Sequence, residues 1–181
     1  MLLAPNEAYL FFKLMLPLQF FVNEKLGVLK NVKTFEAYTK IPLPEKFKVR
    51  NALYENPQLI DEFIDENPDD IPMKDLAIVS KWKKFVKGEF YIERYLKNHS
   101  ILIGQDNEVY GVISLTDPLE EFVPKFFLPQ LVKTVLLPFQ DKIVHDGFLE
   151  PYQIYFGGNI KRELKDIYNK AKKQNKIITA F

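Results

Sequence analysis

The first half of the chain carries apolar positions at helical spacing, and prolines divide it into segments. Residues 6–26 are predicted to form a largely apolar helix that ends near Gly27. Pro17 lies inside this helix and is expected to kink or end it, because proline has no N–H to donate. Pro42 and Pro44 restrict the residues before them to extended backbone, which predicts an extended connection.

Two further helices are predicted before the middle of the chain. In residues 56–67, apolar side chains at positions 59, 60, 63 and 64 form one stripe that a helix would bury. In residues 73–87, apolar positions again follow one face and lysines fill the last turn. Gly88 follows directly and is a typical residue after a helix end.

After Gly88 the apolar period changes from helical spacing to the alternation of β-strands. Residues 101–103 and 109–115 are predicted as paired strands joined by the turn sequence "GQDNE". Residues 130–156 supply about three more short strands. Residues 159–174 are predicted as a last amphipathic helix.

Two glycine-containing stretches are predicted to be structural turns. Asp146 and Gly147 suit a tight hairpin, because glycine tolerates positive φ and aspartate can bond the turn backbone. Gly157 and Gly158 precede the last helix, where free backbone N–H groups attract anions. The glycine spacing of a nucleotide-binding loop is absent, so a strand-to-helix turn is the favoured interpretation, with positive φ or close packing at one glycine.

These elements predict an α+β fold. We expect a helical N-terminal half (residues 1–87) packed on a small, bent antiparallel sheet or barrel. The sheet and the C-terminal helix that closes it occupy residues 88–181, and the two parts could also form one integrated domain.

Composition narrows the classes of chemistry. The chain has no cysteine, which excludes disulfides, thiolate nucleophiles and thiolate metal sites. Asn6, Glu7 and Lys13 interrupt the apolar start, and no basic residue precedes it, so we expect neither a signal peptide nor a membrane span. We therefore expect a cytoplasmic protein that uses no metal and no cofactor.

Charge is unevenly distributed although the net charge is only +1. Residues 55–75 contain eight acids and one base, whereas residues 161–176 contain seven bases and two acids. These segments are either solvated helix faces or contacts with a partner. The candidate binding residues are basic: Lys161, Arg162, Lys165, Lys172, Lys173, Lys83, Lys84 and Lys87.

Candidate catalytic groups are few. His99 and His145 are the only histidines, and no serine stands in a nucleophile-elbow sequence. Carboxylate pairs at 69–70 and 120–121 lie where helix capping is the favoured role. Aromatic residues of the second half either form a core or, with interleaved lysines, a stacking surface for nucleic acid. They are Phe126, Phe127, Phe139, Tyr152, Tyr155 and Phe156, with Lys125, Lys133 and Lys142.

Much of residues 5–181 resembles an uncharacterised family of bacterial proteins, some of which carry a C-terminal SEC-C metal-binding motif. The stretches that carry the resemblance include "LLPFQDKIVHDG" and "FGGNI". The resemblance implies a bacterial, intracellular protein with no established activity and no catalytic residues to assign. The SEC-C zinc site is absent, since the chain has no cysteine.

Two functions from different classes follow as hypotheses. The first is a non-enzymatic binding module whose partner is a protein or a nucleic acid. The second is an enzyme that uses carboxylates in a cleft between the helical and β halves. The small number of candidate catalytic residues and the uneven distribution of charge favour the binding module. Neither the partner nor the oligomeric state follows from the residues.

Overall fold

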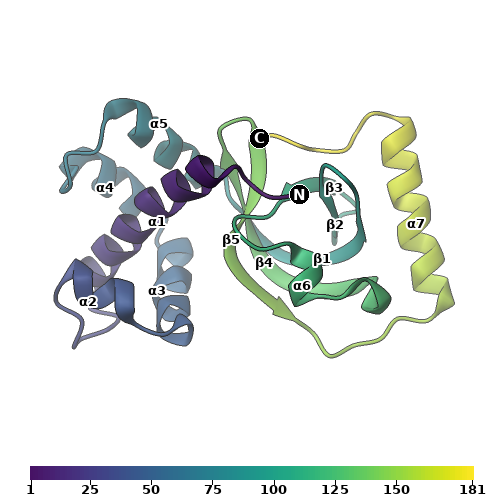
Figure 1. Ribbon diagram of the computed structural model, residues 1–181, viewed down its shortest axis with the longest axis horizontal. Helices are drawn as coiled ribbons and strands as arrows, with labels where there is room; N and C mark the ends of the chain where they lie inside the picture. Colours follow the sequence, from purple (N-terminus) through teal and green to yellow (C-terminus); the bar gives the residue numbers. More distant parts are fainter. The chain divides into compact units, whose positions relative to one another are not determined.

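The computed structural model describes residues 1–181 and has an α+β fold, as predicted. The chain forms two compact units (Figure 1). The helical unit is Asn6–Lys83, and the strand unit is Met1–Pro5 together with Lys84–Phe181. The division therefore falls a few residues before the expected boundary at 87, and the first five residues belong with the strands.

Five α-helices and a short 3₁₀ helix build the helical unit around an aromatic core. The Phe11 and Trp82 rings lie 5.5 Å apart between centroids, and those of Phe21 and Phe63 lie 5.4 Å apart. All four side chains are buried, so the apolar stripes of the sequence meet in one core. The elements are α1 (Pro5–Leu26), α2 (Phe35–Lys40), α3 (Leu43–Glu55), α4 (Leu59–Glu66), α5 (Met73–Lys81) and η1 (Trp82–Lys84).

Three prolines do not have the structural effects that the sequence predicted for them. Helix α1 continues through Pro17 to Leu26, and its neighbours Leu14 and Leu18 are fully buried, so packing holds the helix where one N–H is missing. Pro42 is the N-cap of α3 and Pro44 lies in its first turn. Both positions need no N–H donor, so these prolines begin a helix rather than an extended connection.

The strand unit is a five-stranded sheet whose strands close into a ring in the order β1-β2-β3-β5-β4. Its elements are β1 (Val86–Tyr95), β2 (Ser100–Gly104), β3 (Val109–Ile113), α6 (Leu119–Phe122), η2 (Lys125–Phe127), β4 (Gln130–Phe139), β5 (Lys142–Pro151) and α7 (Gly158–Lys173). The hairpin between β2 and β3 and the last helix lie where the sequence predicted them. Gly88 lies inside β1 instead of ending a helix.

The sheet is mixed, not antiparallel as predicted. Strands β3 and β5 pair in parallel through Val112 with Ile143 and Ile113 with Val144. A parallel pair needs a long crossover connection, which α6, η2 and β4 provide. Residues 130–151 form two long strands instead of about three short ones.

One edge of β3 pairs with three separate segments. Strand β5 pairs with Val112 and Ile113, in the middle of this edge. On one side of β5, Ile178 forms a parallel bridge with Tyr110, and on the other side Leu2 forms one with Ser114. The edge of β3 opposite β2, which we call its outer edge, is thus completed by Leu2 and Ile178 as well as by β5.

Asp146 and Gly147 form a bulge within β5 and do not form the predicted hairpin turn. Thr134 pairs with Leu149 and Leu136 pairs with His145, so three residues of β5 lie opposite the single Val135. Gly147 has φ of +92°, which is the freedom that the sequence prediction assigned to a turn. The hairpin turn lies at Gln140 and Asp141, between β4 and β5.

Candidate functional site

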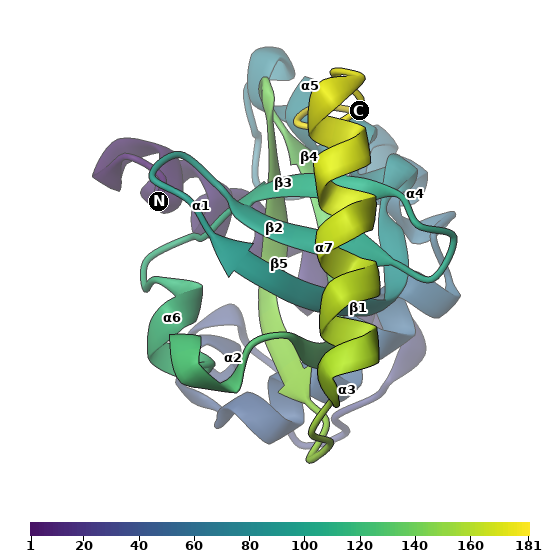
Figure 2. The same cartoon turned by 90° about the vertical axis from the view of Figure 1, so that its right-hand side faces the viewer.

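Helix α7 is fixed to the outer face of β1, β2 and β3 by its apolar side. Leu164 and Tyr168 are buried in one cluster with Ile101, Ile103 and Val109 of the strands. Figure 2 shows α7 crossing in front of these three strands. The Arg94 guanidinium lies 3.9 Å from the centroid of the Tyr168 ring, a cation–π contact that further orients the helix.

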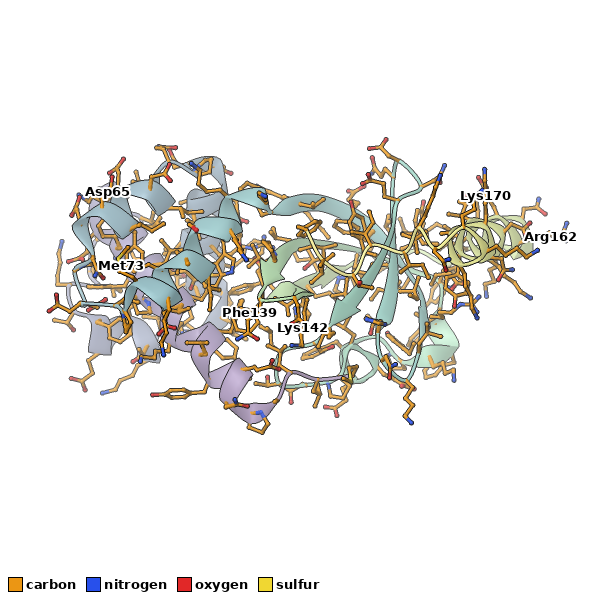
Figure 3. The ribbon with its side chains drawn as sticks, turned by 90° about the horizontal axis from the view of Figure 1, so that it is seen from above. Asp65, Met73, Phe139, Lys142, Arg162 and Lys170 are labelled. Carbon is orange, nitrogen blue, oxygen red and sulfur yellow. The ribbon has the colours of Figure 1, made fainter.

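Five of the predicted binding residues share the exposed surface of α7. Lys161, Lys165 and Lys172 lie along one line of the helix, because their spacing of four and seven residues keeps them close to whole turns. Arg162 and Lys173 follow one position later on the adjacent line. We call these five residues the basic stripe. All five are exposed, and Figure 3 shows Arg162 on the side away from the strands.

The two acids of α7 lie on the side of the helix that also carries Lys170. Glu163 is far from the line of Lys161, Lys165 and Lys172, whereas Asp166 is four positions after Arg162 and lies beside Arg162 and Lys173. No member of the stripe forms an ion pair, whereas Lys25 lies 2.5 Å from Glu66 and Lys83 lies 2.6 Å from Asp61. No direct ion pair therefore neutralises the stripe, although the charge of Asp166 offsets part of it beside Arg162 and Lys173.

The remaining basic candidates do not extend the stripe. Lys83 is paired with Asp61 of α4, Lys84 ends η1 and Lys87 lies on β1. The same ion pairs partly neutralise the acidic run of residues 55–75, because Asp61 and Glu66 both belong to it. The remaining carboxylates of this run are mostly exposed to solvent and do not form a further candidate site.

Gly157 and Gly158 lie at the start of α7, between β5 and the helix. Gly157 is the N-cap with φ of −73°, and Gly158 is the first helical residue. Neither has positive φ, and a Cβ on either would meet nothing within 4 Å. The expected requirement for glycine is therefore wrong, since other residues can adopt this backbone. The geometry of these glycines also gives no support to an anion-binding loop, the alternative to a turn.

His145 lies inside β5 and is buried. Its Nδ1 accepts a hydrogen bond from the Gly147 N–H at 3.2 Å, and its Nε2 has no partner. Burial lowers the pKa of His145 to about 4, so the imidazole is neutral at pH 7. Burial also lowers the pKa of His99, which packs against Gly111. No three of the histidine, aspartate and glutamate side chains lie close enough together to hold a metal ion.

The aromatic residues of the second half divide into core and surface. Phe139 is fully buried, and Phe156 packs against Tyr91 with ring centroids 5.3 Å apart. Phe126 and Tyr155 are 77% and 79% exposed, and Phe127 lies between them. The sequence identified these residues as candidates but did not show which are in the core and which are on the surface, because exposure depends on which strands pair. One local signal existed: "VPKFFLP" places two rings in a single turn between prolines, too short to bury both.

None of the helices has a stretch long and apolar enough to cross a membrane. Comparison with protein-family models, with curated proteins and with solved structures finds no match in any of the three. The resemblance to a bacterial family with SEC-C members therefore stays a prediction.

Proposed function

We propose that the protein is a non-enzymatic module that binds the phosphate backbone of a single-stranded nucleic acid through the basic stripe of α7. The observation that carries the proposal is that five exposed cations lie on adjacent lines of one helix and that none of them is held in an ion pair. Phosphate contacts of this kind supply most of non-specific nucleic-acid affinity.

The position of α7 supports the proposal. Five-stranded closed sheets can bind oligonucleotides across the outer face of their second and third strands. Here α7 covers that face. A nucleic-acid strand that approaches from this side therefore contacts the lysine and arginine side chains of α7, which is well packed on the sheet. The stripe spans about 18 Å at 1.5 Å per residue, long enough to follow a short run of backbone phosphates.

The competing enzyme hypothesis has no specific observation in its favour. It requires converging carboxylates with a histidine, and His145 is buried with a neutral ring while His99 packs on the backbone of β3. Our proposal also takes the protein to be cytoplasmic and bacterial in origin, where nucleic acid is accessible to it.

The test measures the affinity of a fluorescent single-stranded oligonucleotide by anisotropy at increasing salt. With five contacts, the logarithm of the binding constant should fall with the logarithm of salt concentration at a slope of about −3.5. Replacing Lys161, Lys165 and Lys172 together by glutamine should make the slope shallower by about 2. Lys74→Gln is the matched control, since Lys74 is an exposed lysine of α5. An unchanged slope in the triple variant contradicts the proposal.

A further inference from the structure

A groove of about 540 Å³ lies on the strand unit. It shares no residue with the basic stripe, and its lining has a different composition. One wall comes from the end of α6 and from η2, and the other comes from the end of β5 and the segment that leads to α7. None of its lining residues is charged. They are Phe122, Val123, Pro124, Phe127, Gln130, Pro151, Tyr152, Gln153, Ile154 and Tyr155.

Aromatic side chains stand unusually exposed around this groove. The Phe127 and Tyr155 rings lie 6.0 Å apart between centroids, and the Phe126 ring lies 4.2 Å from that of Phe127. Phe122 and Ile154 are also more than one-third exposed. A contiguous apolar patch on the surface of a protein marks an interaction site, because water covers it at a free-energy cost that a partner removes.

Hydrogen bonds hold the wall formed by residues 151–155 in place. The Tyr152 N–H donates to the Leu131 carbonyl at 3.0 Å, and the Gln130 amide donates to the carbonyls of Leu131 and Tyr152. The Ile154 N–H donates to the Tyr152 carbonyl at 2.9 Å. The groove is thus largely formed before any ligand arrives, which lowers the entropy cost of binding.

Two carboxylates lie at one end of the groove, those of Glu89 and Glu150, and Lys133 of β4 pairs with both residues, so this end carries one net negative charge. The Tyr152 hydroxyl donates to a carboxylate oxygen of Glu89. That hydrogen bond, with the nearby charge of Glu150, raises the pKa of Tyr152. A phosphate backbone laid along the groove would approach these carboxylates and would meet no cation among the lining residues. The groove therefore suits a ligand that is apolar along its length and basic at one end.

We propose that this groove binds a proline-rich segment of another protein that carries a lysine or arginine beside its prolines. Proline-rich segments adopt an extended left-handed helix in isolation and dock in aromatic-lined grooves, so little order is lost on binding. The prolines would pack against the exposed faces of the Phe127 and Tyr155 rings, and the basic side chain would lie beside Glu89 and Glu150. This site is separate from the nucleic-acid surface proposed for α7.

A second copy of this chain is the alternative occupant. Its sequence contains "KIPLPEK" at residues 40–46, in which Ile41 and Pro42 have extended backbone and Leu43 is exposed. Pro44 already belongs to α3, so only a short part of this stretch has the required conformation. A separate, unstructured partner segment meets the groove without unfolding a helix, and we therefore favour it.

The test uses a fluorescent peptide of about eight prolines followed by two arginines, titrated with the full chain and followed by anisotropy. Saturable binding in the micromolar range is expected. Tyr155→Ala should weaken it at least about tenfold, because exposed aromatic anchors dominate such interfaces. Tyr155→Phe should bind as the unchanged chain does, since the ring and not the hydroxyl makes the contact. Tyr9→Ala is the matched control, because Tyr9 of α1 is similarly exposed, 71% against 79% for Tyr155.

Charge at the groove end is tested by Glu150→Gln. This variant should weaken the arginine-containing peptide several-fold and leave a peptide of prolines alone unchanged. Absence of binding by the unchanged chain, or equal binding by Tyr155→Ala, overturns the proposal. So does self-association in sedimentation that Tyr155→Ala abolishes while no peptide binds, because a second copy then occupies the groove. Loss of oligonucleotide binding in Tyr155→Ala, without loss of peptide binding, also overturns it.

Discussion

Tyr38 and Gln19 form a polar pair inside the helical unit. The Tyr38 hydroxyl donates to Gln19 Oε1 at 2.9 Å, and both side chains are buried. Burial raises the pKa of Tyr38, so the hydroxyl keeps its proton. Replacing Gln19 by leucine leaves this donor unpaired and should lower the free energy of unfolding by about 1–3 kcal/mol. Urea unfolding followed by the fluorescence of Trp82, the only tryptophan, measures the loss.

The control is the double variant. Tyr38→Phe removes the donor, so adding it to Gln19→Leu should cost less than the sum of the two single changes. Additive costs would mean that the hydrogen bond contributes nothing to stability.

His145 should make the folded protein sensitive to mild acid. Its pKa is about 4 in the folded state, against about 6.5 in an unfolded chain. Between these values the unfolded chain binds a proton that the folded chain does not, so stability falls as the pH decreases from about 6.5 to about 4. The loss should approach about 3 kcal/mol. Urea midpoints measured across this range detect it.

The matched variant is His145→Asn. Asparagine places an oxygen near the position of Nδ1 and so can still accept the Gly147 N–H, but it does not titrate. The variant should be less stable at pH 7, because a smaller side chain leaves a cavity, and its stability should change less with pH over this window. Parallel pH profiles for the two proteins would assign the acid sensitivity to other groups.

At the scale of elements, the bulge in β5 places a strict demand on Gly147. Its φ of +92° is one that other residues rarely adopt, whereas Gly158 lies in open space at the first position of α7. Gly147→Ala should lower the free energy of unfolding by about 1 kcal/mol or more, and Gly158→Ala should leave it nearly unchanged. Thermal unfolding of both variants compares them directly. Equal effects would show that the bulge can relax.

Local patterns predicted the elements better than their pairing. Residues 59–66 and 158–173 show strong helical periodicity, and both are helices close to the predicted bounds. The Asp146–Gly147 pair indicates positive φ correctly, but a hairpin turn and a bulge need the same backbone freedom. Only the distant register of β4 decides between them. The parallel pairing of β3 with β5 is likewise a long-range property that no short stretch encodes.

The candidate surfaces were predictable to different degrees. The basic stripe follows from spacing alone, because a helix with one apolar side must expose the other. The aromatic groove does not, because Phe127 and Tyr155 are 28 positions apart in the sequence and meet only when β4 and β5 are paired. Pattern therefore located the charges, and only the folded chain located the groove.

At the scale of the molecule, residues 177–179 complete the outer edge of β3. The Ile178 N–H donates to the Val109 carbonyl at 2.8 Å, and the Gly111 N–H donates to the Ile178 carbonyl at 2.9 Å. Ile178→Pro removes the first donor and should expose this edge. We expect the Gly111 amide to exchange with solvent at least about tenfold faster, measured by NMR. Ala180→Pro is the control beyond the bridge, and equal protection in both variants would contradict the expectation.

The pairing of β3 also sets an order for folding during synthesis. The helical unit is one continuous stretch, so its core can form as soon as Trp82 has left the ribosome. Leu2 has no partner until Ser114 is made, and Val109 has none on this edge until Ile178 is made. Until Ile178 is made, the part of this edge from Val109 to Gly111 therefore stays unpaired. A nascent chain in this state is a target for chaperones and for pairing with its neighbours on the same messenger RNA.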